Sequence, residues 1–324
     1  MIKAPQFWWK PLPFYGKILS WISWIYGRIV ESRLKSVTPI KVPVPVICVG
    51  NLSLGGTGKT PVVLFLADYF FKKGRKVGVL TRGYRGKVRG PLRVNTHHHT
   101  DKEVGDEPLL LARVVPTWVA RDRLAGAKEM IKKGINLIIM DDGHQNPFLY
   151  KDLNLVVVDG FQGFGNKEIF PLGPLRESLK SGLERADVVV SVRSPSKTLK
   201  KDLTSYKGVI AEADIILDKN TLPFQKIMAF CGIGNPDKFF TSLEKAGVEI
   251  VERQAFPDHY RYSASDLKLL KKKALSHQSI LVTTEKDWIR LDKLNQKDIL
   301  PIPLTLKWKD WAKTEKLIIQ KILK

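Results

Sequence analysis

Short apolar runs alternate with longer amphipathic segments over most of the chain. Apolar runs of about four to eight residues are typical of buried strands, and apolar residues spaced three or four apart are typical of helices. The predicted strands are residues 42–49, 76–81, 136–140, 153–158, 187–192, 208–217, 227–230, 248–251 and 280–283. The predicted helices are residues 60–73, 106–115, 121–133 and 309–322. This alternation predicts an α/β fold with a mostly parallel sheet and helices on both of its faces.

The same pattern divides the chain into three parts. We expect residues 1–36 to form an N-terminal membrane helix, residues 37–222 a large α/β domain, and residues 223–324 a smaller C-terminal α/β domain. A length of 324 residues is enough for two domains. Residues 82–101 are polar, basic and rich in turn formers, so a loop or a small hairpin is expected there.

The N-terminal segment is rich in aromatic residues, with four of the eight tryptophans in residues 7–30. Only ten uncharged residues separate Lys17 from Arg28, whereas a membrane-spanning helix needs about 20. Apolar side chains recur at helical spacing at Phe14, Ile18, Trp21, Ile22, Ile25 and Ile29. The pattern favours an amphipathic helix in a membrane interface, with a helix packed on the protein's own core as the alternative. No small-residue cleavage site follows, so a signal peptide is not expected.

Composition and charge narrow the possible partners. The chain is 44% hydrophobic and 27% charged, which excludes a disordered chain and a polytopic membrane protein. A formal net charge of +22 favours anionic partners, namely nucleic acid, an anionic membrane surface or a phosphorylated substrate. The two cysteines, Cys48 and Cys231, lie in apolar runs and are predicted to be buried, reduced thiols.

A glycine-rich loop follows the first predicted strand and precedes the first predicted helix. It matches the phosphate-loop pattern G-x-x-x-x-G-K-[ST], except that Ser53 occupies the first position. Its glycines let backbone N–H groups converge on phosphate oxygens, Lys59 can reach the β and γ phosphates, and the Thr60 hydroxyl can ligate Mg²⁺. The loop predicts a P-loop NTPase-like domain that uses ATP and Mg²⁺. The predicted ATP-binding residues are Ser53, Leu54, Gly55, Gly56, Thr57, Gly58, Lys59 and Thr60.

Two acidic residues, Asp141 and Asp142, come directly after the apolar run 137–140. Ligands of open α/β sheets bind at the carboxyl ends of the strands. We therefore expect one of the two aspartates to hold Mg²⁺ directly or through water, and a turn cap is the alternative for Asp141.

The class of phosphoryl transfer is narrowed by motifs that are missing from the sequence. The nearest match to a guanine-recognition motif, Thr284–Asp287, has its residues in the wrong order, and no helicase signature is found. GTP and nucleic acid are therefore not expected as partners. The segment from Arg82 to Arg93 carries five cations and no acid, which suits an anionic substrate or lipid headgroups, with a solvated basic loop as the alternative.

Six short motifs follow one another in a fixed order: residues 50–61 (GNLSLGGTGKTP), 81–84 (TRGY), 105–108 (GDEP), 141–143 (DDG), 174–177 (PLRE) and 256–260 (FPDHY). Together they resemble the tetraacyldisaccharide 4′-kinases, the lipid A 4′-kinases of Gram-negative bacteria. The resemblance extends from the N-terminal helix to residues 283–287. It implies transfer of the γ-phosphate of ATP to the 4′-hydroxyl of a lipid A disaccharide 1-phosphate precursor, giving lipid IVA, at the cytoplasmic face of the inner membrane.

The resemblance also implies roles for individual residues. Asp106 is similar to the catalytic base of the family, His259 to its partner, and Lys59 completes the catalytic set. A helix cap is the alternative role for Asp106, and a turn residue is the alternative for His259. The metal is implied to lie near Thr60, Glu107, Asp141, Asp142 and Gln145, and the substrate near Arg82, Tyr84, Arg123 and Arg176.

One motif departs from the family pattern. Asn146 stands where a histidine is usual and His144 where an apolar residue is usual, which puts a role of that histidine in doubt here. The run His97–His99 is also foreign to the pattern, and metal binding there is the less favoured interpretation. Two rival functions remain: a P-loop ATPase or kinase of a soluble substrate, and a nucleotide-switched nucleic-acid-binding protein.

Overall fold

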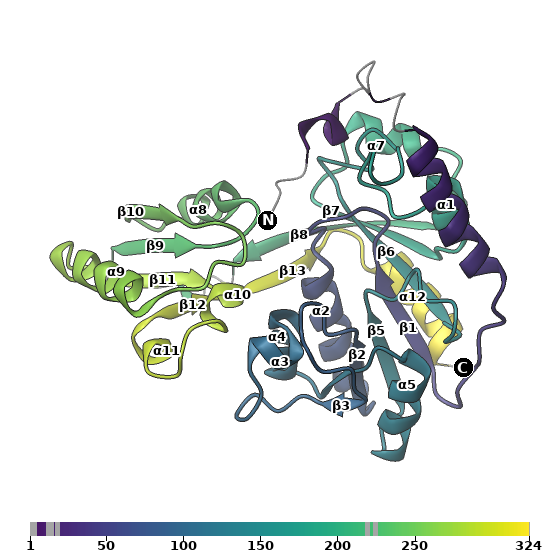
Figure 1. Cartoon of the computed structure of the whole chain (residues 1–324), viewed down its shortest axis with the longest axis horizontal. Helices are drawn as coiled ribbons and strands as arrows, with labels where there is room; N and C mark the ends of the chain where they lie inside the picture. Colours follow the sequence, from purple (N-terminus) through teal and green to yellow (C-terminus); the bar gives the residue numbers. More distant parts are fainter. Residues whose placement is uncertain (1–4, 11–15, 17–19, 218–220, 223–225, 324) are drawn as a thin grey trace.

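The computed structural model describes residues 5–10, 16, 20–217, 221–222 and 226–323. Its strands form a nine-stranded sheet, in the order β13-β8-β7-β6-β1-β5-β2-β4-β3, and a four-stranded sheet, in the order β10-β9-β11-β12. Figure 1 shows the two sheets lying apart, joined by β8 and β13.

The larger sheet contains β1 (Val46–Gly50), β2 (Val77–Thr81), β3 (Leu92–Arg93), β4 (Thr117–Val119), β5 (Leu137–Asp141), β6 (Leu153–Asp159), β7 (Val188–Val192), β8 (Val209–Leu217) and β13 (Leu304–Trp308). The helices around it are η1 (Gln6–Trp9), α1 (Ser20–Lys35), α2 (Lys59–Lys72), α3 (Asp101–Val104), α4 (Asp106–Ala112), α5 (Arg123–Lys132), α6 (Leu179–Glu184), α7 (Lys197–Asp202) and α12 (Ala312–Ile322). Its strands pair in parallel except at the two edges, where β3 and β13 are antiparallel to their neighbours.

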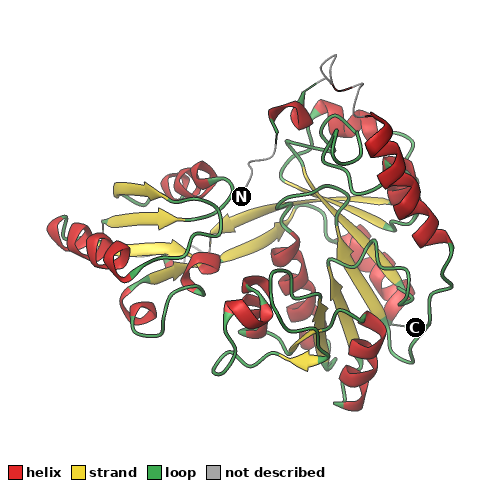
Figure 2. Ribbon diagram, in the orientation of Figure 1, coloured by secondary structure: helices red, strands yellow, loops and turns green. Residues whose placement is uncertain are grey.

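The smaller sheet is entirely parallel and consists of β9 (Ile227–Cys231), β10 (Ile250–Ala255), β11 (Ile280–Thr284) and β12 (Leu300–Ile302). Its helices are α8 (Pro236–Lys245), α9 (Ala264–Ser276), α10 (Glu285–Trp288) and α11 (Asn295–Asp298). Helices cover both faces of each sheet in Figure 2. The predicted α/β class with a mostly parallel sheet is confirmed.

Apolar strand residues form the core because both faces of the large sheet are covered. On one face, side chains of β1 and β5 pack against α2 and α12, which contribute Phe70 and Ile318. On the other face, Met130 of α5 packs against the opposite side of β2 and β5. The first strand begins at Val46 and not at residue 42, because Pro43 and Pro45 have no amide hydrogen to pair with a neighbour. Cys48 and Cys231 are buried and free, as predicted.

The C-terminal residues return to the larger sheet. β13 pairs antiparallel with β8, with Trp308 opposite Ala213, and α12 buries Ile318 and Ile322 in the core of that sheet. Residues 223–324 were expected to form one small domain, whereas the smaller sheet ends with β12. The hydrophobic pattern could not distinguish the two arrangements, because an edge strand and its helix have the same pattern in either sheet.

The helix α1 contacts the rest of the protein through Ser23 and Tyr26 and exposes its two tryptophans. Ser23 donates a hydrogen bond from Oγ to the carbonyl of Ile169 (2.9 Å), and Tyr26 packs edge-on against Phe170. The expected apolar face points outward, with exposed fractions of 60% at Trp21, 67% at Trp24, 41% at Ile25 and 63% at Ile29. Phe14 and Ile18 lie outside the described residues. Among the helices that the structure describes, none has the length and hydropathy needed to cross a membrane.

Candidate functional site

The phosphate loop lies between β1 and α2, at the carboxyl edge of the larger sheet. Gly55 and Gly58 adopt positive φ angles of 109° and 91°, a region that glycine enters without strain. The side-chain amide of Asn51 donates to the carbonyl of Ser53 (2.7 Å) and holds the turn from inside. Gly58 is the N-cap of α2 and offers no side-chain cap, so the first amides of this 14-residue helix remain available to an anion.

Lys59 and Asp142 face each other beside this loop. The Lys59 Nζ lies 3.5 Å from Oδ1 of Asp142, and the Arg176 guanidinium donates to the same carboxylate at 2.9 Å. Burial alone would raise the pKa of Asp142, but the two cations outweigh it and lower the pKa to about 2. Asp142 is therefore ionised at neutral pH, next to the predicted phosphate-binding lysine.

Asp141 is buried behind Asp142 and accepts a hydrogen bond from the Thr81 hydroxyl (3.1 Å). Burial and the negative charge of Glu107 raise the pKa of Asp141 to about 7. Ionisable carboxyl groups therefore gather at the ends of β5 and α4, where the sequence predicted a metal. Within the described parts of the chain, no group of three or more His, Cys, Asp or Glu side chains is close enough to bind a metal by itself.

Gln145 belongs to a polar network beneath the loop. Its Nε2 donates to the carbonyl of Asn51 (2.9 Å) and to Oε1 of Glu177 (3.0 Å). Glu177 in turn pairs with Arg185 at 2.5 Å. Gln145 thus ties the start of the phosphate loop to the segment that carries Arg176.

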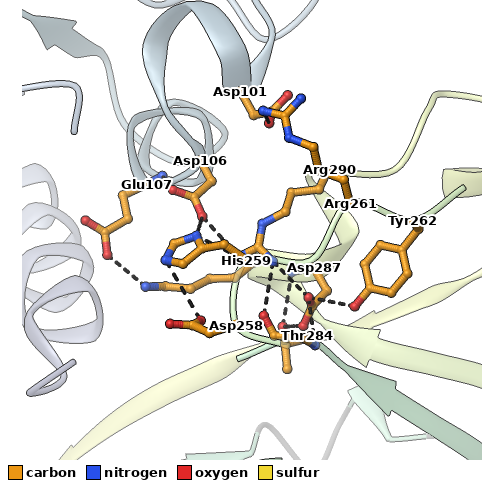
Figure 3. Close-up of polar contacts among 12 residues, drawn as sticks. Asp101, Asp106, Glu107, Asp258, His259, Arg261, Tyr262, Thr284, Asp287 and Arg290 are labelled. Carbon is orange, nitrogen blue, oxygen red and sulfur yellow. Dashed lines mark hydrogen bonds and ion pairs between the residues drawn. The ribbon is translucent and has the colours of Figure 1, made fainter. Parts of the chain in front are cut away.

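A second cluster forms where α4 meets the smaller sheet (Figure 3). The Nδ1 of His259 lies 2.9 Å from Oδ2 of Asp106, which is buried. The helix-cap interpretation of Asp106 is wrong, because Gly105 is the N-cap and Asp106 is the first helical residue. His259 does occupy a turn, with a φ of 57°, and its side chain still reaches Asp106.

Sequence reasoning missed the cations that complete this cluster. Arg290 donates from NH2 to Oδ2 of Asp106 (3.0 Å), and Lys286 donates to Oε1 of Glu107 (2.8 Å). Burial would raise the pKa of Asp106, but His259 and Arg290 together hold that pKa well below its usual range. Residues 283–287, where the family resemblance ends, lie in this region. The i,i+3 spacing of Asp287 and Arg290 was the one sequence feature that could have indicated an ion pair at the arginine.

The predicted substrate residues differ in exposure. Arg82 and Tyr84 are exposed in the loop after β2, and Arg176 reaches Asp142. Arg123 is only 4% exposed, its guanidinium donates to the carbonyl of Ala120, and burial lowers its pKa to about 10. The structure therefore brings Arg176 to the phosphate loop and holds Arg123 inside the fold.

The basic segment 82–93 is a loop, as one of the two expectations had it, and the small hairpin does not form, because the two-residue strand β3 pairs with the distant strand β4. Its backbone pairs with α3, since the amide of Lys87 donates to the carbonyl of Lys102 (3.2 Å) and that of Val88 to the carbonyl of Glu103 (2.9 Å). The side chains of Arg85, Lys87 and Arg89 remain exposed. The backbone of the loop is thus fixed next to α4 while its cations face solvent.

The residues that depart from the family pattern form hydrogen bonds within the protein. His144 is buried, with Nε2 3.0 Å from the carbonyl of Gly182, and burial lowers its pKa to about 3. The side-chain oxygen of Asn146 accepts the amides of Phe148 and Leu149, both at 3.2 Å, and closes a turn. In the run 97–99, the Nδ1 of His99 accepts the amide of Asn95 (2.9 Å).

Known proteins are similar to nearly the whole chain. The family model described as tetraacyldisaccharide-1-P 4′-kinase matches residues 16–323. A tetraacyldisaccharide 4′-kinase of Rhodospirillum centenum is 39% identical over 98% of this chain and 96% of its own length. One from Caulobacter vibrioides (strain NA1000) is 41% identical over 97% of each chain.

A solved structure is also similar. The crystal structure of LpxK from Aquifex aeolicus, described as a complex with ATP, superposes with a TM-score of 0.78 at 29% identity. The match covers 95% of this chain and all of that one. The chain therefore belongs to the tetraacyldisaccharide-1-P 4′-kinase family and is a phosphotransferase with an alcohol acceptor.

Proposed function

We propose that the protein transfers the γ-phosphate of ATP to the 4′-hydroxyl of a tetraacylated glucosamine disaccharide 1-phosphate, giving lipid IVA. One observation carries the proposal. The phosphate loop with Lys59 lies at the same sheet edge as the carboxylates of Asp142 and Glu107, and Glu107 adjoins the pair Asp106–His259. A cradle for a triphosphate and a hydrogen-bonded acid–imidazole pair are the parts that phosphoryl transfer to an alcohol requires.

ATP is the proposed phosphate donor. The uncapped N-terminus of α2 and the exposed glycines of the loop suit the triphosphate, and Lys59 suits its terminal phosphates. The related LpxK of Aquifex aeolicus, described as a complex with ATP, supports this assignment. The ATP-binding residues remain those of the predicted loop, 53–60.

Mg²⁺ is the proposed metal, and the residues present fit it. Burial and two neighbouring carboxylates raise the pKa of Asp141, which is the electrostatic signature of a place that a divalent cation would stabilise. Mg²⁺ takes one or two protein carboxylates together with phosphate oxygens and water, so a three-carboxylate cage is not needed. When bound, Mg²⁺ would neutralise charge on the phosphates. Its proposed ligands and neighbours are Thr60, Glu107, Asp141, Asp142 and Gln145.

The acceptor hydroxyl is proposed to lose its proton to the Asp106–His259 pair. Asp106 is ionised, because its pKa lies below its usual range, and it is fixed at 2.9 Å from His259. Phosphoryl transfer has a loose transition state, so orienting the hydroxyl matters more than the strength of the base. Asp106 therefore accepts the proton, and His259 holds the carboxylate in place.

The substrate is proposed to arrive from an anionic membrane surface. Trp21, Trp24 and Ile29 of α1 are exposed, which suits an interfacial helix. Arg82, Tyr84, the other exposed cations of residues 82–93 and Arg176 are proposed to contact the anionic disaccharide. The buried Arg123 is proposed to support this region from inside the fold. We therefore propose a peripheral enzyme at the cytoplasmic face of the inner membrane of a Gram-negative bacterium.

The direct test uses labelled ATP, Mg²⁺ and the tetraacylated disaccharide 1-phosphate. A bisphosphorylated glycolipid is the expected product, identified by its mass and by label at the 4′ position. Hydrolysis of ATP with no labelled lipid would favour the rival soluble-substrate function. Co-sedimentation with anionic vesicles, with and without residues 1–30, tests the membrane assignment separately.

A further inference from the structure

We infer that Arg290 is a positioning residue, which holds the Asp106 carboxylate in register with His259 through a guanidinium anchored in the smaller sheet. The inference rests on the proposed function, since it assigns a role within the same site. It concerns a side chain that no motif of the sequence singled out.

One terminal nitrogen of the Arg290 guanidinium is anchored beside the smaller sheet. Its NH1 donates to Oδ1 of Asp287 (3.0 Å) and to the carbonyl of Gly232 (3.2 Å). Asp287 is fully buried, and it also accepts the hydroxyls of Tyr262 (2.8 Å) and Thr284 (2.6 Å). A carboxylate with so many donors has a single orientation, and it therefore fixes the guanidinium.

The other terminal nitrogen reaches the start of α4. NH2 of Arg290 donates to Oδ2 of Asp106, the same oxygen that faces Nδ1 of His259. Oδ1 of Asp106 accepts the backbone amide of Glu107 (3.0 Å). Both carboxylate oxygens are thus engaged, and the carboxylate has little freedom to rotate.

The carbonyl of Gly232 couples the two groups that meet Asp106. It accepts the backbone amide of His259 (2.9 Å) as well as NH1 of Arg290. Imidazole and guanidinium are therefore fixed relative to one another before either meets Asp106. Figure 3 shows His259 and Arg290 approaching Asp106 from the smaller sheet, while Asp106 extends from α4.

The chemistry of the side chain explains why an arginine is needed. Arg290 is 4% exposed on its side chain, and a buried cation is retained only where several acceptors surround it. The planar guanidinium can bond Asp106 and Asp287 at once, whereas a lysine ammonium is a point charge on a flexible stem. An internal control exists in Arg261, which pairs with Asp101 of α3 at 3.2 Å across the same contact but is 60% exposed.

The experiment compares full-length R290Q, R290K and R261Q with the unaltered protein in the lipid-phosphorylation assay. We expect R290Q to lower kcat by about 100-fold, since small misplacements of a reacting group have effects of that size, with KM for ATP unchanged within about twofold. R290K should fold as the parent does and recover only part of kcat. R261Q should keep kcat within about twofold, because exposed ion pairs contribute little.

A double-mutant cycle tests whether Arg290 acts through Asp106. In a D106N background, R290Q should cost less than about twofold in kcat, since the carboxylate that it positions is already lost. An equal loss of kcat in both backgrounds would overturn the inference. So would an equal loss in R261Q, or parental kcat in a folded R290Q.

If R290Q does not fold, the kcat of R290K tests the inference instead. A parental kcat in R290K overturns the inference. The two proposals fail in distinguishable ways. An unaltered protein that phosphorylates the glycolipid, with variants that match it, refutes only the role of Arg290. An unaltered protein that does not phosphorylate the glycolipid refutes the proposed function and this inference together.

Discussion

The phosphate loop and the Asp106–His259–Arg290 cluster are built in opposite ways. The loop is contiguous, and Asn51 holds it through partners two and four residues away. The cluster joins residues as far as 184 positions apart, Asp106 at the start of α4 and Arg290 just after α10. A local turn keeps its shape wherever the smaller sheet lies, whereas the cluster exists only when α4 and the smaller sheet are in contact. We therefore expect the proposed holding of the donor phosphates and the proposed orienting of the acceptor to be separable.

The largest effect is expected on the loop side. Lys59→Ala removes the ammonium that faces Asp142 at 3.5 Å and that is proposed to stabilise the transferred phosphate. Loss of such a preorganised charge lowers kcat by up to about 1,000-fold. Initial rates of lipid phosphorylation, at saturating ATP, measure it. Turnover equal to that of the unaltered protein would contradict the assignment of the phosphate cradle.

Asp106→Asn should impair the Asp106–His259–Arg290 cluster and leave the phosphate loop unaffected. It keeps the side-chain shape and removes the proton acceptor, so kcat should fall by about 100-fold or more while ATP affinity stays near that of the parent. Fluorescent-nucleotide binding and steady-state rates, measured on one preparation, separate the two quantities. An unchanged kcat would place the proton acceptor elsewhere, and a parallel loss of ATP binding would show that the two regions are not separable.

Acid should destabilise the loop side through His144. A β-carbon on Gly50 would lie 2.6 Å from Cβ of His144, so the backbone of this buried residue packs directly against the end of β1. Burial lowers the pKa of His144 to about 3, below the ~6.5 of an unfolded histidine. The unfolded chain then binds the extra proton, so stability is complete above about pH 6.5 and falls as the pH drops toward 3.

The destabilisation by acid can be measured by comparison with the variant His144→Gln. Its side-chain amide can still donate to the carbonyl of Gly182 but does not titrate. Between pH 6.5 and 4.5 the unaltered protein should lose about 2–3 kcal/mol through this residue. Urea unfolding at both pH values, on both proteins, gives the difference. An identical pH dependence in the variant would show that His144 is not the titrating group.

The smallest effect is expected from the basic loop, which packs on the α3–α4 side. Neutralising Arg85, Lys87 and Arg89 to Gln leaves the backbone pairing to α3 intact and removes three exposed cations. The KM for the lipid should rise by about tenfold at low salt and less at high salt, with kcat unchanged. Saturation curves on anionic mixed micelles at two salt concentrations test this. A KM that does not move would reduce the loop to a solvated surface.

Local features of the site could be predicted because their geometry is set by neighbours in the chain. Gly55 and Gly58 adopt the positive φ angles that a phosphate loop needs, and Asp142 follows a buried strand as expected. Arg290 was missed because its role depends on Asp106, which lies 184 positions away, and its i,i+3 spacing from Asp287 does not by itself reveal that contact. Arg123 shows the converse, since its resemblance to a family residue implied substrate contact and the fold buries it.

The sequence by itself was enough for the fold class, the phosphate loop and the family. The fold class depends on short-range periodicity of apolar and polar residues, and the loop and the family depend on contiguous motifs. Only the tertiary structure decided that β13 and α12 rejoin the first sheet. It also decided that Asp106, His259 and Arg290 share one set of hydrogen bonds. These are contacts between distant segments, and their free energy depends on which surfaces meet once the strands have paired.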